Sequence, residues 1–468
     1  NSNALWSLSV GANAGGDLGV AGSVSYSTVD NTSRATATDA VLRSDGTVRL
    51  LADDASSVRS IAGAASFSGK AGFGAGLGLT EVANSTQATL LRSSVSAQAL
   101  DAQATAGNEV IAASAALAIT GSGVAGSGAV TVNTIDNDTA ALATQSTVAT
   151  TGAASLQARD DSSILSIAGS LAFSGGAAGI GGAAAYNAIG SRTRTLASGS
   201  SLGGASVALQ AQQLSDITAV AAGGAGASTA GISGSLGINR IGTDTSVRAD
   251  AGRITATGRA DISAQDTAGI FSTTGAASAA GSAAIGVAAS YNEADNHSSA
   301  GVSGGSIDAA DIAVSALRGS DLQAWAVAGT ISGSVSVSGS IGINFAGGQT
   351  SAQVDGGARL QARNNALLLA DADDSIRARA GAVGLGGSVG GAGAIALNDI
   401  TATTAARLSG TGTLLDGQAQ GPAAMAVPSG ALRPRSSPTQ TPSSNPLPGR
   451  QLTEPVRGAA VLAASTAG

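Results

Sequence analysis

The residues that could do chemistry are few and scattered along this 468-residue chain, which has no cysteine, one histidine (His297) and one lysine (Lys70). A nucleophile needs an oriented base beside it. A site built on histidine or cysteine ligands needs several of them. We therefore interpret His297 as a solvent-exposed residue in a turn. No enzyme activity and no cofactor are expected.

Acidic pairs are the next candidates, because Ca²⁺ binds carboxylate and carbonyl oxygens. Asp160-Asp161 and Asp373-Asp374 stand at equivalent places in a repeated pattern. The G-G-x-G-x-D nonapeptide of calcium-binding β-rolls is absent, however. We expect these aspartates to form turns, with a calcium site as the alternative.

Asparagine sequons also recur at one place in the pattern, at Asn31, Asn84, Asn137 and Asn296. Asparagine side chains hydrogen-bond to their own backbone in tight turns, and Asn-x-Ser/Thr in an exposed corner accepts glycans. We expect exposed corners here, formed by Asx turns, with glycosylation as the alternative.

One sequence pattern occurs eight times, with starts at residues 5, 58, 110, 164, 217, 270, 322 and 376, so the unit is about 53 residues long. Two markers define it. The twelfth position is glycine in seven units: Gly16, Gly69, Gly121, Gly175, Gly281, Gly333 and Gly387, with Ser228 as the exception. An apolar residue followed by asparagine comes 22 or 23 residues after six of the starts: Asn133, Asn187, Asn239, Asn292, Asn344 and Asn398.

The local pattern within each unit is that of β-strands. Apolar residues alternate with small or polar ones over stretches of five to ten residues, as in 164–174, and Ser-Gly or Gly-Gly pairs follow. Units this small cannot each bury an adequate core, so they must stack and share one. We predict an all-β fold, an elongated parallel β-solenoid in which the six asparagines form a hydrogen-bonded ladder. Tandem antiparallel β-sandwich modules are the alternative.

The interior of this solenoid should be narrow where Gly, Ala and Ser predominate. The aromatic residues all fall in the first 24 positions of a unit, so we expect that section to be the wider part of the core. The sequence leaves open whether one unit winds once or twice around the solenoid.

Proline divides the chain into two parts, because all eight prolines lie between Pro422 and Pro455. Proline removes a backbone donor and is excluded from sheet interiors. We predict that residues 1–421 form the repeat solenoid and that residues 422–468 form a flexible tail rich in proline and serine.

Composition excludes several partners. The chain carries a formal charge of −7, and an acidic body repels nucleic acid. No apolar run approaches the roughly 18 residues needed for a transmembrane helix. Lysine and arginine are too scattered for the converging charges of a carbohydrate lyase site.

The repeats resemble those of the large bacterial filamentous adhesins of type V secretion, closest in texture to the leukotoxin-like filamentous adhesin group, whether autotransporter or two-partner passengers. The segment SIAGSLAFSGGAAGIGGAAAYNAIGSRTRT, residues 166–195, carries this resemblance, which extends over about 5–420. It implies a β-helical stalk, secreted or held at the bacterial cell surface. The family's secretion domain is not recognisable, so we expect this chain to be a piece of a longer protein.

We therefore expect an extracellular structural and adhesive section that mediates attachment or aggregation through an extended surface. Its expected partners are a host or neighbouring-cell surface, matrix or glycan, or further copies stacked end to end. The alternatives are a β-helix that binds or degrades polysaccharide and a fibre or surface-layer component without a ligand.

Overall fold

The computed structural model describes residues 1–409, 413–416, 423–427 and 459–467, and within them it is all-β without a helix. The chain winds as a parallel β-solenoid of eight coils, one for each sequence unit. We number the coils 1 to 8 by their starts at residues 5, 58, 110, 164, 217, 270, 322 and 376. The alternative of antiparallel sandwich modules is wrong, because every strand pairing is parallel.

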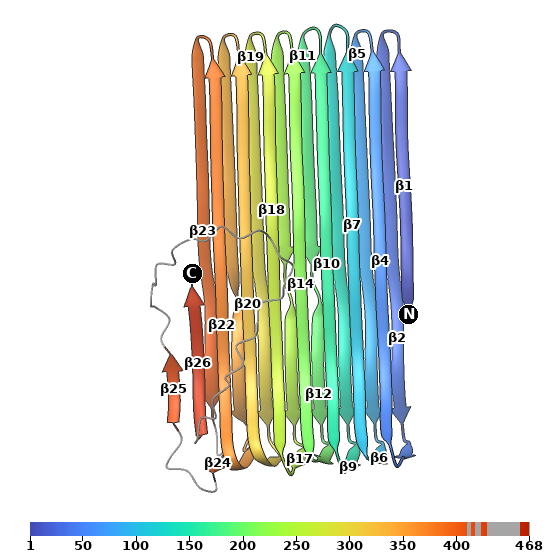
Figure 1. Ribbon diagram of the computed structural model, residues 1–468, viewed down its shortest axis with the longest axis vertical. Helices are drawn as coiled ribbons and strands as arrows, with labels where there is room; N and C mark the ends of the chain where they lie inside the picture. The colour runs from blue at the N-terminus through green and yellow to red at the C-terminus, as the bar shows by residue number, and fades with distance from the viewer. Residues whose placement is uncertain (410–412, 417–422, 428–458, 468) are drawn as a thin grey trace.

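Each coil is a flattened loop made of two long strands, one in each of two facing sheets (Figure 1). The first sheet contains, in coil order, β1 (Ser2–Gly15), β4 (Thr47–Ser68), β7 (Ala99–Thr120), β10 (Ala153–Ser174), β14 (Ser206–Ala227), β18 (Arg259–Ala280), β20 (Ser306–Ser332) and β22 (Arg359–Gly386). The second contains β2 (Leu18–Thr38), β5 (Ala71–Leu91), β8 (Val124–Thr144), β11 (Ala178–Ile189) with β12 (Arg192–Ser198), β15 (Ala230–Ile241) with β16 (Asp244–Asp250), β19 (Ala283–Ser303), β21 (Val335–Asp355) and β23 (Val389–Leu408).

Short strands close the coils at the end opposite the glycine turns. They are β3 (Val41–Arg43), β6 (Ser94–Ala97), β9 (Thr147–Thr150), β13 (Ser201–Gly204) and β17 (Arg253–Ala256); later coils merge this strand into β20 and β22. The strands run along the longest axis of the molecule (Figure 1). The slab is therefore longer along its strands than along its stack of coils.

The pairing register reproduces the sequence repeat residue for residue. Leu5 pairs with Val58, Val58 with Val110 and Val110 with Ile164, and the series continues to Ile376. From coil 2 onward these residues point inward and form one buried apolar layer with Val82, Ile135, Ile189 and Ile241 of the second sheet. One unit therefore winds once, with equivalent residues directly above one another.

Two parts of each coil differ in what they bury. The turn half runs from the repeat start to the marker asparagine, 164–187 in coil 4, and between these two residues its inward positions in coil 4 are Ser, Ala and Gly. The corner half is the rest of the coil, and it buries a large cluster of Leu, Ile, Val and Ala.

Glycine lets the two sheets of the turn half approach closely, as expected from the sequence. A Cβ added to Gly181 would lie 2.1 Å from the carbonyl oxygen of Gly224 on the opposite sheet. Only a residue without a side chain fits at this position.

The aromatic residues do not occupy the core, so the expectation of a wider aromatic section was wrong. Trp6, Phe73 and Phe173 point outward and are 66%, 45% and 46% exposed. Alternation in a strand separates two faces, and here the smaller residues take the inner one.

The unit boundary is also not where we expected it. Asp160-Asp161 and Asp373-Asp374 lie inside the long strands β10 and β22, not in turns. Of the predicted tail, β25 (Ala423–Val427) and β26 (Ala459–Ala467) are strands, and β26 pairs with β22; the rest of 422–468 lies outside the described residues. β24 (Thr413–Asp416) also pairs with β22.

Candidate functional site

The six marker asparagines lie together as a ladder through the stack. Each side-chain amide donates to the side-chain oxygen of the next asparagine, over 2.8 to 3.0 Å, in the series Asn133, Asn187, Asn239, Asn292, Asn344 and Asn398. The first five are fully buried. The ladder ties successive coils at the border between the two halves, and only its last member, Asn398, is exposed.

The marker glycines form the tight turns that join the two sheets: Gly16, Gly69, Gly121, Gly175, Gly281, Gly333 and Gly387. A Cβ on Gly175 would come within 2.2 Å of the carbonyl oxygen of Gly121 in the coil before it. Ser228, the exception, donates its hydroxyl to the carbonyl of Gly175 over 2.6 Å. These glycines are structural too, because each turn packs directly on its neighbour.

A third row of polar residues, which we name the polar seam, crosses the interior of the corner half next to the border. Its first-sheet members lie side by side on β10, β14, β18 and β20: Asp160, Gln213, Asp266 and Arg318. Asn137 of the second sheet donates to Asp160 over 2.9 Å. Thr243, Thr245 and Asn296 donate to Asp266 over 2.8 to 2.9 Å.

Burial perturbs the carboxyl groups of the polar seam. Loss of solvent raises the pKa of Asp160 to about 6, although hydrogen bonds from Ser162, Asn137 and Gln213 oppose the shift. The same cause raises the pKa of Asp266 to about 7, against the hydrogen bonds from its threonines and the charge of Arg318. Such shifts are common at functional sites but also arise in structural networks.

An ion pair closes the polar seam at its C-terminal end. The buried guanidinium of Arg318 donates to Asp374 and, over 2.8 Å, to the carbonyl oxygen of Gly347. Burial raises the pKa of Asp374, and Arg318 opposes this shift. The polar-seam side chains Asp160, Gln213, Asp266 and Arg318 are all buried.

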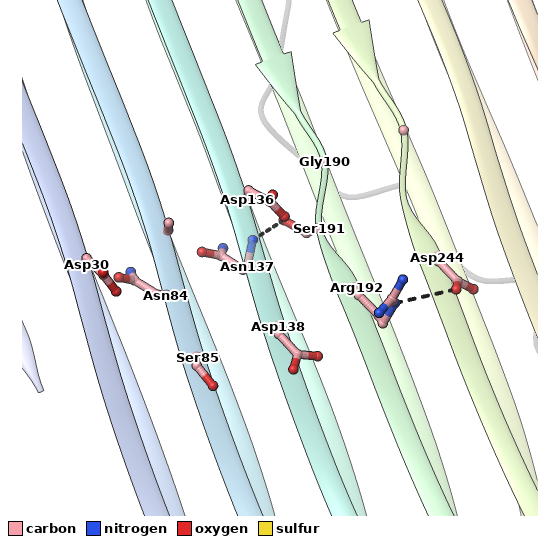
Figure 2. Close-up of a pocket in the computed structure, with 12 residues that line it drawn as sticks. Asp30, Asn84, Ser85, Asp136, Asn137, Asp138, Gly190, Ser191, Arg192 and Asp244 are labelled. Carbon is pink, nitrogen blue, oxygen red and sulfur yellow. Dashed lines mark hydrogen bonds and ion pairs between the residues drawn. The ribbon is translucent and has the colours of Figure 1, made fainter.

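The outer surface above the polar seam is hollowed on the second sheet, where β11–β12 and β15–β16 are interrupted at Gly190 and Gly242 (Figure 2). This hollow measures about 480 Å³. Its charged lining consists of Asp30, Asp136, Asp138, Arg192 and Asp244.

The charges around the hollow are partly paired. Arg192 lies 3.7 Å from Asp244, and Asp138 lies 3.2 Å from Arg194. Partial burial raises the pKa of Asp136, with Arg192 opposing and Asp138 adding to the shift. Across the described part of the chain, no three His, Cys, Asp or Glu side chains converge as metal ligands. The hollow therefore offers hydrogen-bonding groups and a modest negative field.

Several predicted placements were wrong in the same way. His297 is exposed, but it lies within β19 beside Asp244, not in a turn. Asn84, Asn137 and Asn296 are buried inside strands, and Asn31, in β2, donates to Asp54 over 3.2 Å. The sequons thus contribute to the interior of the slab and not to exposed corners.

The sequence interpretation missed the polar seam and the hollow. The acidic residues and sequons had been noted separately, but nothing in the linear pattern showed that they face one another across the interior. The Gly190 and Gly242 breaks were a usable signal, since each follows the marker asparagine by three residues.

Comparison with known proteins yields no match to a family model, to a curated protein or to a solved structure. As for membranes, none of the residues described here belongs to a helix that could cross a bilayer.

Proposed function

We propose that this chain is a structural and adhesive section of an extracellular bacterial surface adhesin, exported by a type V route. The observation that carries the proposal is the form of the molecule, a slab of stacked coils with two broad sheet faces. The resemblance of the repeats to filamentous adhesins supports it.

The arrangement of polar groups also supports a binding role over a catalytic one. The groups with strongly shifted pKa values, Asp160 and Asp266, are sealed in the interior. The hollow on the second sheet has no nucleophile beside a base. Contact through an extended surface with a cell, matrix or glycan needs neither an accessible group of shifted pKa nor a nucleophile beside a base.

Adhesion is tested with beads coated with the purified chain. We expect them to attach to epithelial cells, to a matrix-coated surface or to like-coated beads at least several times more often than beads coated with an inert protein. A chain with half a coil deleted serves as the misfolded control. Attachment no greater than that of the inert protein on every surface would refute the proposal.

The hollow supports a second candidate, binding of polysaccharide, because carboxylates and an arginine there can hydrogen-bond to sugar hydroxyls. A glycan array would test it, with Asp136→Asn and Arg192→Gln as variants and Asp101→Asn on the opposite sheet as the control. Glycan binding that is lost in Asp136→Asn and Arg192→Gln but kept in Asp101→Asn would favour polysaccharide binding. Release of reducing ends from a polysaccharide would make it an enzyme.

A further inference from the structure

The turn half exposes an unusual amount of apolar surface on both broad faces. Among the described residues, the strongly exposed large apolar side chains all lie there except Val41, Leu51 and Leu408. On the first sheet of the central coils this surface is formed by Leu117, Ile119, Leu165, Ile167, Leu171 and Phe173.

Charge is rare in the same region, where the first sheet carries only Arg59, Arg377 and Arg379, all in coils 2 and 8. In coils 3 to 7 the turn half has no charged residue, over 110–133, 164–187, 217–239, 270–292 and 322–344. The corner half carries nearly all the ion pairs of the described residues. The slab is therefore divided across its strands into an apolar and a charged part.

The apolar area is large enough for a stable interface. About ten residues at 3.3 Å each, across the five uncharged coils 3 to 7 at 4.8 Å, give roughly 800 Å² on each face. The largest apolar patch of a typical monomer is about 300–600 Å², and a standard interface buries about 800 Å² per partner.

Lipid is a poor occupant for these faces. The turn half of β1 and that of β22 each have a paired strand on one side only in the described part of the chain. In hydrocarbon those edges would leave backbone donors and acceptors unsatisfied, at several kcal/mol each. A second slab laid face to face covers the apolar side chains and leaves the edges in water.

We propose that two copies of this chain associate face to face through the turn half of the first sheet, about a two-fold axis parallel to the strands. A two-fold axis along the stack that passes through the middle of the strands would place apolar surface on the charged half of the partner. The axis parallel to the strands instead joins apolar surface to apolar surface. If it passes between coils 4 and 5, coil 3 faces coil 6 of the partner and coil 1 faces coil 8.

The outward residues of the first sheet suit this arrangement. At the centre, the side chains of Leu171 and Phe173 lie over Gly224 and Gly226 of the next coil, where a Cβ on either glycine would meet them. The large side chains therefore fill the space above the glycines, and this part of the face is flat. The outer pairs combine large with small residues. Leu117 and Ile119 of coil 3 face Ala277 and Ala279 of coil 6, and Ala12 and Ala14 of coil 1 face Val383 and Leu385 of coil 8. Coils 2 and 7 show no such difference in size.

The second sheet does not suit it. At its centre, the same operation would set Ile180 against Ile232 and Gly182 against Gly234. Large side chains would meet large ones, and glycines would leave a gap. This contrast assigns the interface to the first sheet.

The corner half of the first sheet tolerates the arrangement, because three of its carboxylates already have partners. Asp261 lies 2.9 Å from Arg259, Asp161 lies 3.5 Å from Arg159, and Asp101 lies 3.8 Å from Arg49. Paired charges reduce the repulsion between two acidic chains.

Sedimentation of the full chain over a range of concentrations tests the proposal. We expect a dimer. The Phe173→Ser/Ile119→Ser variant should raise the dimer Kd by about a hundredfold or more, since buried apolar anchors dominate interfaces. The matched control is Ile180→Ser/Ile232→Ser, which changes side chains of similar exposure on the second sheet and should leave the dimer intact. Circular dichroism verifies that each variant is folded.

The coil pairing is tested by a charge exchange. Leu117→Glu and Ala277→Lys should each weaken the dimer. Combined in one chain they should restore it, because each Glu would then face a Lys of the partner. Lack of restoration would overturn this pairing.

Three other outcomes would overturn the proposal. One is a monomer at tens of micromolar, and a second is equal loss of association in the second-sheet control. The third is a monomer that binds phosphatidylcholine vesicles through the same side chains. The test uses the purified chain alone, so it does not depend on the adhesive function.

Discussion

The two halves of each coil achieve the same backbone pairing with opposite distributions of side chains. The corner half buries Leu156, Leu209 and Ile262 in a continuous apolar cluster and turns charged residues outward. The turn half buries Ser166 and Ala168 and turns Ile167 outward. Parallel strand pairing therefore tolerates either distribution. In a monomer, however, only the corner half buries its large apolar side chains and gains the hydrophobic stabilisation that this burial provides.

The interior of the turn half has a different source of order. Hydroxyl pairs bridge its sheets, such as Thr131 with Ser166 at 2.7 Å and Ser25 with Ser60 at 2.8 Å. Other buried hydroxyls, including those of Ser170 and Ser233, have no partner among the described protein atoms. A hydrogen bond adds about 1 kcal/mol net, so we infer that this half depends on its neighbours and on association for much of its stability.

The largest expected effect comes from breaking the register between coils. Deleting 217–269 joins Asp216 to Ile270, and since Asp216 pairs with Gly269 and Ile217 with Ile270, every later residue stays in phase. We expect a folded slab that is shorter by one coil. Deleting about half a coil would set turn-half residues against corner-half residues, so we expect no folded product. Circular dichroism and melting would compare the two.

That comparison also tests whether the halves are distinct. If the half-coil deletion folds as well as the whole-coil deletion, corner-half and turn-half strands are interchangeable as neighbours. The division of the slab would then have no energetic basis.

The second effect is on pH dependence, which should originate in the polar seam and not in the turn half. A raised carboxyl pKa means that the folded protein binds the proton more tightly than the unfolded chain. The contribution of these two carboxyl groups to stability is then greatest below about pH 4. It falls as the pH rises through their pKa values in the folded protein, about 6 for Asp160 and about 7 for Asp266. At about 1.4 kcal/mol per unit, the contribution of Asp266 is on the order of 4 kcal/mol.

Urea unfolding at pH 4.5 and pH 8 measures this difference. Asp266→Asn should raise stability at pH 8 and flatten the profile, whereas Asp261→Asn, on the outer surface of the same strand, should leave the slope in place. A profile that is equally steep without Asp266 would locate the titrating group elsewhere.

A matched pair of leucines gives the third effect and the most direct comparison of the halves. Leu209 is 0% exposed in the corner half, and Leu171 is 48% exposed in the turn half. Leu209→Ala should cost about 2–5 kcal/mol through the cavity that it leaves. Leu171→Ala should cost less than about 1 kcal/mol. Chemical denaturation of dilute monomer measures both, and equal losses would contradict the division.

The sequence was sufficient for the architecture because the fold is one-dimensional. The repeat starts and the marker asparagines predicted the pairing register, since stacking places equivalent residues above one another. The turns at the corner gave a weaker signal. Asp39, Arg92, Gln145 and Ala251 adopt the left-handed conformation that glycine usually supplies. Gly199 and Gly304 supply it in other coils, so glycine marks that turn only in part of the stack.

The internal site was harder to predict than the fold, for a physical reason. A period of two identifies two faces of a strand but does not say which face is buried. Burial was inferred from size, and in the turn half this placed Phe173 and Trp325 inside. Asp160 and Asn137 were likewise assigned to turns because buried carboxyls and amides are uncommon. Only the facing strand, 23 residues away in sequence, supplies the partner that makes burial tolerable.

The smallest effect concerns the turns that end the turn half, and a pair of glycines isolates it. A Cβ on Gly175 would lie 2.2 Å from the carbonyl oxygen of Gly121, whereas a Cβ on Gly121 would lie 3.4 Å from that of Gly69. Gly175→Ala forces two coils apart and should cost about 1 kcal/mol or more. Gly121→Ala should be neutral or stabilising by up to about 1 kcal/mol, because alanine restricts the unfolded chain. If thermal melts show equal shifts, the turns can separate freely, and close stacking does not constrain this end of the slab.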